Sequence, residues 1–278
     1  RRGLLAPGLW PSVRQCPGVG VGQEKEVDCF SSYCDRGDQW VARQFPADPV
    51  RHRAEISPSY FIHPDAASRA RAYNPDLQII VTLRDPVRRA WSNHLHEVRK
   101  GHVSGENLRF DKALANNPLY RDQGRYAMHL ARWFDCFPRA QIHVLFQEEI
   151  TVNGRAAADQ VTQALGLPPI AGFVDQRANE SVSYRNPVVG EMLWKAGDMA
   201  RRRGFSPVVE RIKAAPGIRH VHQFNRQKVS DLVAPMASAT EAALTDYFAP
   251  DIAALEAMIG RPVPGPYTHL TLPKNRAV

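Results

Sequence analysis

Two short apolar runs alternate with amphipathic segments in the middle of the chain. The runs "LQIIVTL" (77–83) and "QIHVLF" (141–146) are apolar almost throughout and rich in β-branched residues, as strands covered on both faces are. After the first run, apolar residues recur at helical spacing, at Val87, Trp91, Leu95 and Val98. The alternation of strands and helices predicts an α/β domain with a central parallel sheet flanked by helices.

Other segments complete this pattern. Helices are expected at 65–73, 122–137 and 156–167, and Pro250 should split the apolar stretch 239–260 into two helices. The segment "SPSYFIHP" indicates a turn followed by a short extended piece. The first 24 residues carry Gly and Pro too densely for a regular element, and their "GVGVG" lacks the strand and helix that flank a dinucleotide-binding loop.

Composition narrows the class of protein. The 278 residues are enough for one large α/β domain, and 36 Lys plus Arg against 28 Asp plus Glu favour an anionic partner. No apolar run approaches the roughly 20 residues that span a bilayer. The richness in Ala, Arg and Pro, with no anchor, fits a bacterial cytoplasmic protein, and a lumenal Golgi domain cut from its membrane anchor would look similar.

The four cysteines, Cys16, Cys29, Cys34 and Cys136, form no CxxC pair. They therefore suggest neither a zinc ribbon nor a thioredoxin-type site. Reduced or partly buried thiols are the simplest interpretation, and a bridge between Cys29 and Cys34 stays open.

The corner after the first apolar run is the strongest candidate for chemistry. A parallel strand that runs into a helix presents backbone N–H groups and the positive end of the helix dipole to whatever lies beyond it. Asp85 can cap this helix, Pro86 suits its first position, and Arg84 can offer paired donors to a phosphate. Ser92, about two turns into the helix, could add a third contact. The alternative is that Arg84 and Ser92 are ordinary surface residues.

The motif "LRDPVRRAWSNHLH" (83–96) resembles the segment of sulfotransferases that binds the 3′-phosphate of 3′-phosphoadenosine 5′-phosphosulfate (PAPS). The resemblance extends from about Leu9 to Val263 and is closest to the glycan-modifying, heparan-sulfate type and bacterial members. It implies a single P-loop-like domain over residues 1–265, with the tail 266–278 outside it.

The resemblance also implies roles for particular residues. Arg84 and Ser92 would hold the 3′-phosphate, and Glu26 would be the base that deprotonates the acceptor. PAPS would be the co-substrate, with PAP (adenosine 3′,5′-bisphosphate) as its product and no metal. The acceptor would be a carbohydrate or another hydroxyl or amine compound. Apart from the resemblance, Lys228 in the basic segment "FNRQK" is a weaker candidate for contacting an anionic glycan or the phosphates of the cofactor, and a solvated basic face is the alternative.

One family element is missing. The resemblance places a loop that cradles the 5′-phosphosulfate at about residues 2–7, but "RGLLAP" stands there without its Lys or Gly-Thr-Thr. The first strand would then precede Arg1, and the domain would be incomplete at its N-terminus. A protein of this fold that binds the nucleotide or an anionic glycan without transferring sulfate is therefore the alternative function.

Two other site types are disfavoured. His94, His96 and His102 could suggest a metal, but His94 and His96 project from different faces of a helix. The basic segments "RRRGF" and "ERIKAAPGIRHVHQFNRQK" form no recognition motif for nucleic acid, and no such partner is expected.

Overall fold

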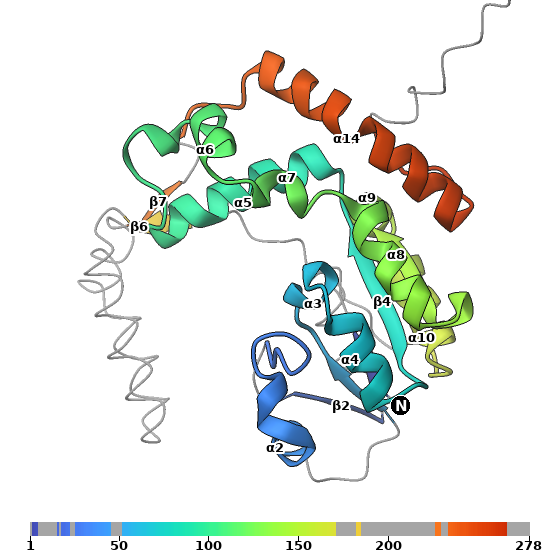
Figure 1. Ribbon diagram of the computed structural model, residues 1–278. Helices are drawn as coiled ribbons and strands as arrows, with labels where there is room; N and C mark the ends of the chain where they lie inside the picture. The colour runs from blue at the N-terminus through green and yellow to red at the C-terminus, as the bar shows by residue number, and fades with distance from the viewer. Residues whose placement is uncertain are drawn as a thin grey trace, which may run out of the picture. The chain divides into compact units, whose positions relative to one another are not determined.

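The computed structural model describes residues 2–4, 16, 18–22, 26–45, 52–170, 182–184, 226–228 and 233–265 (Figure 1). The chain divides into two compact units. The first consists of residues 1–89, 122–178 and 243–278, and the second of residues 90–121 and 179–242.

The first unit contains a five-stranded sheet of order β2-β3-β1-β4-β5. Every neighbouring pair in it is parallel, so the expected α/β class with a central parallel sheet is confirmed. The strands are β1 (Arg2–Leu4), β2 (Val19–Val21), β3 (His52–Glu55), β4 (Gln78–Leu83) and β5 (Ile142–Phe146).

Helices of the first unit pack along this sheet. Helix α4 packs against α8, while α9 and α10 contact β5. Ile80 of β4 shares a buried cluster with Leu145 of β5 and Val161 of α10. The helices are α2 (Gly37–Arg43), α3 (Ser59–Ile62), α4 (Ala66–Tyr73), α8 (Tyr126–Cys136), α9 (Gln147–Val152) and α10 (Gly154–Ala164), with 3-10 turns η1 (Cys34–Arg36) and η3 (Arg139–Gln141).

The second unit has its own small core. It includes most of α5 (Pro86–Lys100), whose first residues belong to the first unit, and Val98 of α5 packs there against Val233. The other elements are η2 (Gly105–Leu108), α6 (Phe110–Asn116), all but the last residue of α7 (Leu119–Asp122) and an antiparallel pair, β6 (Val182–Tyr184) with β7 (Arg226–Lys228).

Two histidines, His94 on α5 and His102 just after it, have structural partners. His94 is fully buried, with its ring nitrogens 3.0 Å from the Leu108 carbonyl oxygen and 3.4 Å from the Tyr120 hydroxyl. His102 lies 2.9 Å from the carboxylate of Glu97. Among the residues with described positions, no group of three His, Cys, Asp or Glu could hold a metal ion.

The predicted break at Pro250 is wrong. Helix α14 (Ser238–Ile259) runs through this proline without interruption. Leu244, Phe248, Ile252 and Leu255 are all buried at spacings of four, four and three residues, so both halves bury one continuous stripe. This shared burial offsets the backbone hydrogen bond that Pro250 cannot donate.

In the N-terminal half, three expected secondary-structure assignments also differ from the structure. Strand β2 lies inside the glycine-rich "GVGVG", where no regular element was expected. The piece expected to be extended after Pro58 is the short helix α3. Strand β1 occupies Arg2–Leu4 in the centre of the sheet, so the expectation that the first strand precedes Arg1 is wrong. Residues 5–15, which follow β1, lie outside the described part.

Within the described residues, no helix combines the length and apolar character needed to cross a membrane. None of the four cysteines, all of which lie in described positions, forms a disulfide. Cys29 is buried with its sulfur 3.1 Å from the Tyr60 hydroxyl, and Cys34 is exposed, so the possible Cys29–Cys34 bridge is not formed.

Close packing at Gly124 gives a test of the fold. A Cβ at this position would stand 2.6 Å from the ring of Phe248 and 3.2 Å from Pro86. Gly124→Ala should therefore lower the free energy of unfolding by about 1–3 kcal/mol, measured by urea denaturation. In a Phe248→Leu background the same substitution should cost less. An equal cost in both backgrounds would contradict this account of the packing.

Candidate functional site

The strand order brings several segments to one edge of the sheet. Because the strands are parallel, the chain leaves β2, β3, β4 and β5 at the same edge, and the direction of winding reverses at β1. Ligands of open α/β sheets bind outside the carboxyl ends of the strands at such a reversal. The candidate site therefore consists of the loops and helix starts that come directly after these strands.

The corner between β4 and α5 has the predicted cap. Asp85 is 3% exposed, and its Oδ1 accepts a hydrogen bond of 2.7 Å from the backbone N–H of Arg88. Pro86 is the first helical residue. The backbone N–H of Asp85 donates to Glu148 Oε1 at 3.0 Å, so the residue after β4 is tied to α9, which follows β5. Arg84, directly before this fixed corner, is exposed.

Burial changes the acid–base properties of this corner. It raises the pKa of Asp85, although the N–H of Arg88 acts in the opposite direction. Burial also lowers the pKa of Arg89, whose guanidinium donates to Gln123 Oε1 at 3.0 Å and bonds with the Tyr126 hydroxyl. The first turn of α5 is therefore anchored by charged groups inside the protein, and Arg84 is left at the surface.

A cavity of about 500 Å³ lies along β4 within the first unit. Its volume is in the range of small-molecule sites. Most of the lining is apolar and comes from β4, α3 and α8, including Val81, Phe61 and Trp133. Its polar lining residues are Ser57, Ser59, Tyr60, Thr82, Arg84, Arg89, Gln123 and Tyr126. The cavity therefore joins the exit of β3 to the exit of β4.

The segment after β2 carries Glu26, which is exposed. The next two residues are held by the exit of β3. The N–H of Val27 donates to Glu55 Oε1 at 3.1 Å, and the N–H of Asp28 donates to Ser57 Oγ at 3.0 Å. Two consecutive backbone groups beside Glu26 are thus fixed by side chains from the neighbouring strand.

Asp28 adopts an uncommon backbone conformation, with φ of 52°. Its carboxylate oxygen Oδ1 accepts hydrogen bonds from the hydroxyls of Ser31 and Ser59. Asp tolerates the left-handed region better than most residues, and these bonds stabilise the turn. The chain direction just after Glu26 is therefore set by a strained residue whose side chain is held by α3.

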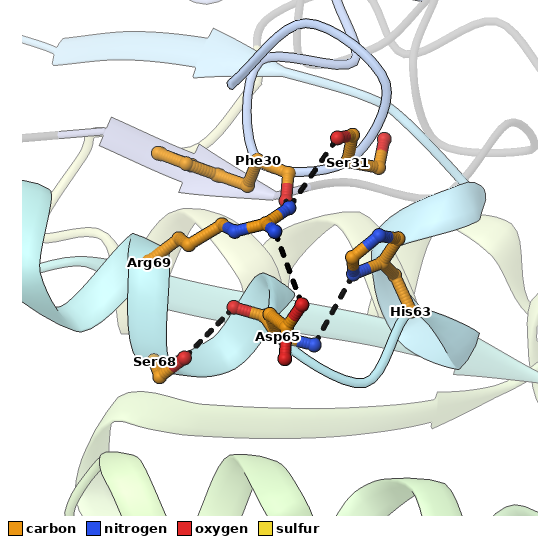
Figure 2. A network of polar contacts seen from close by, with 6 residues as sticks. All are labelled: Phe30, Ser31, His63, Asp65, Ser68 and Arg69. Carbon is orange, nitrogen blue, oxygen red and sulfur yellow. Dashed lines mark hydrogen bonds and ion pairs between the residues drawn. The ribbon is translucent and has the colours of Figure 1, made fainter. Parts of the chain in front are cut away.

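Arg69 of α4 anchors the same segment from its other end (Figure 2). One guanidinium nitrogen, Nη1, donates to the carbonyl oxygens of Phe30 and Ser31 at 3.2 and 3.4 Å. The other, Nη2, bonds with Asp65 at 3.0 Å, which orients the guanidinium plane. Figure 2 shows this arginine between the loop and Asp65, so α4 also contributes to the position of the loop.

Glu55 is the most unusual titratable group at this edge. It is 6% exposed, and its Oε2 has no hydrogen-bond partner among the described residues. Its other oxygen, Oε1, also accepts a hydrogen bond from Ser57 Oγ. Burial raises the pKa of Glu55 to about 7, although the bonds from Ser57 and from Val27 act in the opposite direction. This carboxyl group therefore changes its charge near neutral pH.

The predicted site residues have different positions. Glu26 and Arg84 both belong to the first unit and follow parallel strands at the same edge of its sheet. Ser92 is exposed on α5, in the part that belongs to the second unit, and its joint action with Arg84 stays a prediction. Lys228 lies in β7 of the second unit, and its role stays a prediction as well.

Sequence reasoning missed Glu55, Ser57, Ser59 and Arg69. The strand that carries Glu55 was not identified, because "HRAEIS" is polar and short. The partners of Arg69 are backbone carbonyls 38 and 39 residues away, for which the sequence carries no signal.

The chain belongs to the sulfotransferase family, because the model of the "Sulfotransferase family" matches residues 25–171, more than half of its length. The matched range contains Glu26, Glu55, Arg84 and Ser92. The resemblance inferred from the sequence is thereby confirmed at the level of the family.

Individual curated relatives share about 26–31% of their residues with this chain over roughly half of its length. Human heparan sulfate glucosamine 3-O-sulfotransferase 6 is 31% identical over 165 residues, which cover 57% of this chain and 46% of the relative. Human heparan sulfate glucosamine 3-O-sulfotransferase 5 is 26% identical over 144 residues, which cover 48% and 42%. The chain thus spans less than half the length of these curated relatives.

A solved structure supports the fold. The sulfotransferase from Alicyclobacillus acidocaldarius superposes with a TM-score of 0.66 at 22% identity, covering 94% of this chain and 96% of the other. At this identity the likeness establishes the fold and not the substrate.

The buried carboxyl group of Glu55 predicts a pH-dependent difference in stability. Its pKa is about 7 in the folded protein and near its ordinary value of 4.5 in the unfolded chain, so the folded state binds the proton more tightly. The contribution of Glu55 to stability is therefore largest below pH 4.5, falls as the pH rises towards 7, and is constant above that.

Glu55→Gln keeps the shape and the carbonyl acceptor but removes the titration. As the pH rises from about 4.5 to 8, the free energy of unfolding of the variant should increase relative to that of the wild type by roughly 1–3 kcal/mol. Urea denaturation at each pH measures this difference. Glu106→Gln, an exposed change in η2, should show no such trend. If the stability difference between Glu55→Gln and the wild type did not depend on pH, the pKa of Glu55 in the folded protein would be the ordinary one and not a raised one.

Proposed function

We propose that this protein transfers a sulfuryl group from PAPS to a hydroxyl or amine of an acceptor, most simply a carbohydrate. Membership of the sulfotransferase family supports sulfuryl transfer in general. PAPS is inferred as the donor because the motif around Arg84 resembles the segment that binds its 3′-phosphate. The acceptor class is inferred from the heparan sulfate enzymes among the relatives of this chain.

The corner at Arg84 is the observation that carries the proposal. Asp85 caps α5 and is itself fixed to Glu148, so the positive end of a 15-residue helix stands at the carboxyl edge of the sheet beside an exposed arginine. A dianionic phosphate suits both features, because the guanidinium offers two parallel donors. Ser92 is proposed as the hydroxyl that completes this 3′-phosphate site.

Glu26 is proposed as the base. Sulfuryl transfer is an in-line displacement in which the acceptor oxygen or nitrogen attacks sulfur, the S–O bond to the nucleotide breaks, and the acceptor loses its proton. Glu26 is exposed at the same edge as Arg84, and the residues after it are held from β3 and α4. A carboxylate on a fixed loop can accept this proton, while the departing PAP carries the negative charge.

One observation favours a second function. The residues after β1 would have to cradle the 5′-phosphosulfate, but "LAP" (5–7) directly follows β1 without the lysine of the family's loop. Loss of one well-placed donor to a developing charge commonly reduces turnover by about 10²–10³. Binding of the nucleotide or an anionic glycan without transfer is therefore the alternative function.

Binding of the nucleotide tests the phosphate site. Arg84→Ala should weaken the affinity for PAP more than about tenfold in titration calorimetry, because a charge-assisted paired contact is lost. Arg155→Ala removes the same charge from a surface ion pair on α10 and should leave the affinity unchanged. Equal affinities of Arg84→Ala and wild type would remove Arg84 from the site.

Transfer of radiolabelled sulfate from PAPS to a panel of carbohydrate, lipid-linked and small hydroxyl acceptors tests the reaction. The wild type should label at least one acceptor, and Glu26→Gln should lower turnover by about 10²–10⁴ without changing the affinity for PAP. Binding of PAP without any labelling would favour the alternative function. A Glu26→Gln variant with normal turnover would exclude Glu26 as the base.

A further inference from the structure

We propose that Glu55 is a positioning residue that sets the placement of Glu26 by holding the backbone N–H of the following residue. This inference rests on the proposed function, since it concerns the same base. Glu55 belongs to the end of β3, and no feature of the sequence assigned it a role.

The contacts of Glu55 form a short chain towards Glu26. Its Oε1 accepts hydrogen bonds from the N–H of Val27 and from the hydroxyl of Ser57. Ser57 Oγ in turn accepts the N–H of Asp28. A single buried carboxyl oxygen thus orients both groups that fix the two residues after Glu26, one directly and one through the serine.

Burial makes this arrangement stiff. Val27 is 3% exposed, Ser57 is 7% exposed and Glu55 is 6% exposed, so water does not compete for these bonds. An unmade bond to a buried N–H is costly, which holds the loop in one conformation. An exposed base needs such a support, because a displacement of about 1 Å can cost about 10²-fold in rate.

The charge of Glu55 should change the strength of the hydrogen bonds that its Oε1 accepts from Val27 and Ser57. A carboxylate accepts hydrogen bonds more strongly than a neutral acid does. Among the described residues, the ionisable groups that act on Glu55 are Tyr60 and Asp28, and the Cys29 sulfur lies 3.1 Å from the Tyr60 hydroxyl. Because the pKa of Glu55 is about 7, the loop should be held more firmly above neutral pH than below it.

The test compares three variants with the wild type. Glu55→Ala removes the acceptor and should lower kcat for sulfate transfer by about 10–100-fold, with the affinity for PAP unchanged. Glu55→Gln keeps an acceptor oxygen and should retain kcat within about fivefold, but the inflection near pH 7 in the profile of kcat should be absent. Glu106→Gln, an exposed change in η2, should match the wild type throughout.

Amide hydrogen exchange gives a readout that does not depend on activity. The amides of Val27 and Asp28 should exchange faster in Glu55→Ala, and to a smaller extent in Ser57→Ala, while those of α10 stay protected. If Glu55→Ala does not fold, Ser57→Ala and Glu55→Gln still test the same contacts.

The proposal would be overturned if kcat were unchanged in Glu55→Ala, or if Glu55→Gln were as impaired as Glu55→Ala. It would also be overturned if the amides of Val27 and Asp28 exchanged at the wild-type rate in both Ser57→Ala and Glu55→Ala. Absence of sulfate transfer by the wild type would refute the proposed function instead. The exchange data would then decide alone whether Glu55 holds the loop.

Discussion

The parallel order of the sheet is the constraint on which the candidate site depends. With β1 in the centre and β3 and β4 on either side of it, the chain leaves four strands at one edge. The loop after β2, the turn into α3, the corner before α5 and the start of α9 therefore lie along this edge, although β2 and α9 are about 125 residues apart in the sequence. No single segment supplies the site, and shifting one strand would separate its parts.

Buried and half-buried carboxyl groups join these segments. Glu55 holds the N–H of Val27 across 28 positions in the sequence, and Glu148 holds the N–H of Asp85 across 63. A buried carboxyl group without an ionic partner costs free energy that a core of apolar residues would not. Such groups are concentrated where exposed residues need a fixed backbone, so rigidity at the edge is obtained at a cost in stability.

The comparisons and the site contribute different parts of the functional argument. Family membership rests on a match to 147 consecutive residues, from 25 to 171, and the fold rests on a neighbour of 22% identity. Neither identifies the acceptor, because a shared fold does not determine the substrate.

The sequence by itself determined the α/β class, the corner with Asp85 as its cap, and the helices with a single apolar stripe. These features depend on local spacing, which is visible in one chain. Tertiary structure decided the rest. Helix α14 runs through Pro250 because it buries a continuous apolar stripe on both sides of the proline. Val19–Val21 is a strand because β3 pairs with it. Glu55 acquires its raised pKa, and its hold on the residue after Glu26, only when folding buries it against partners that are distant in the sequence.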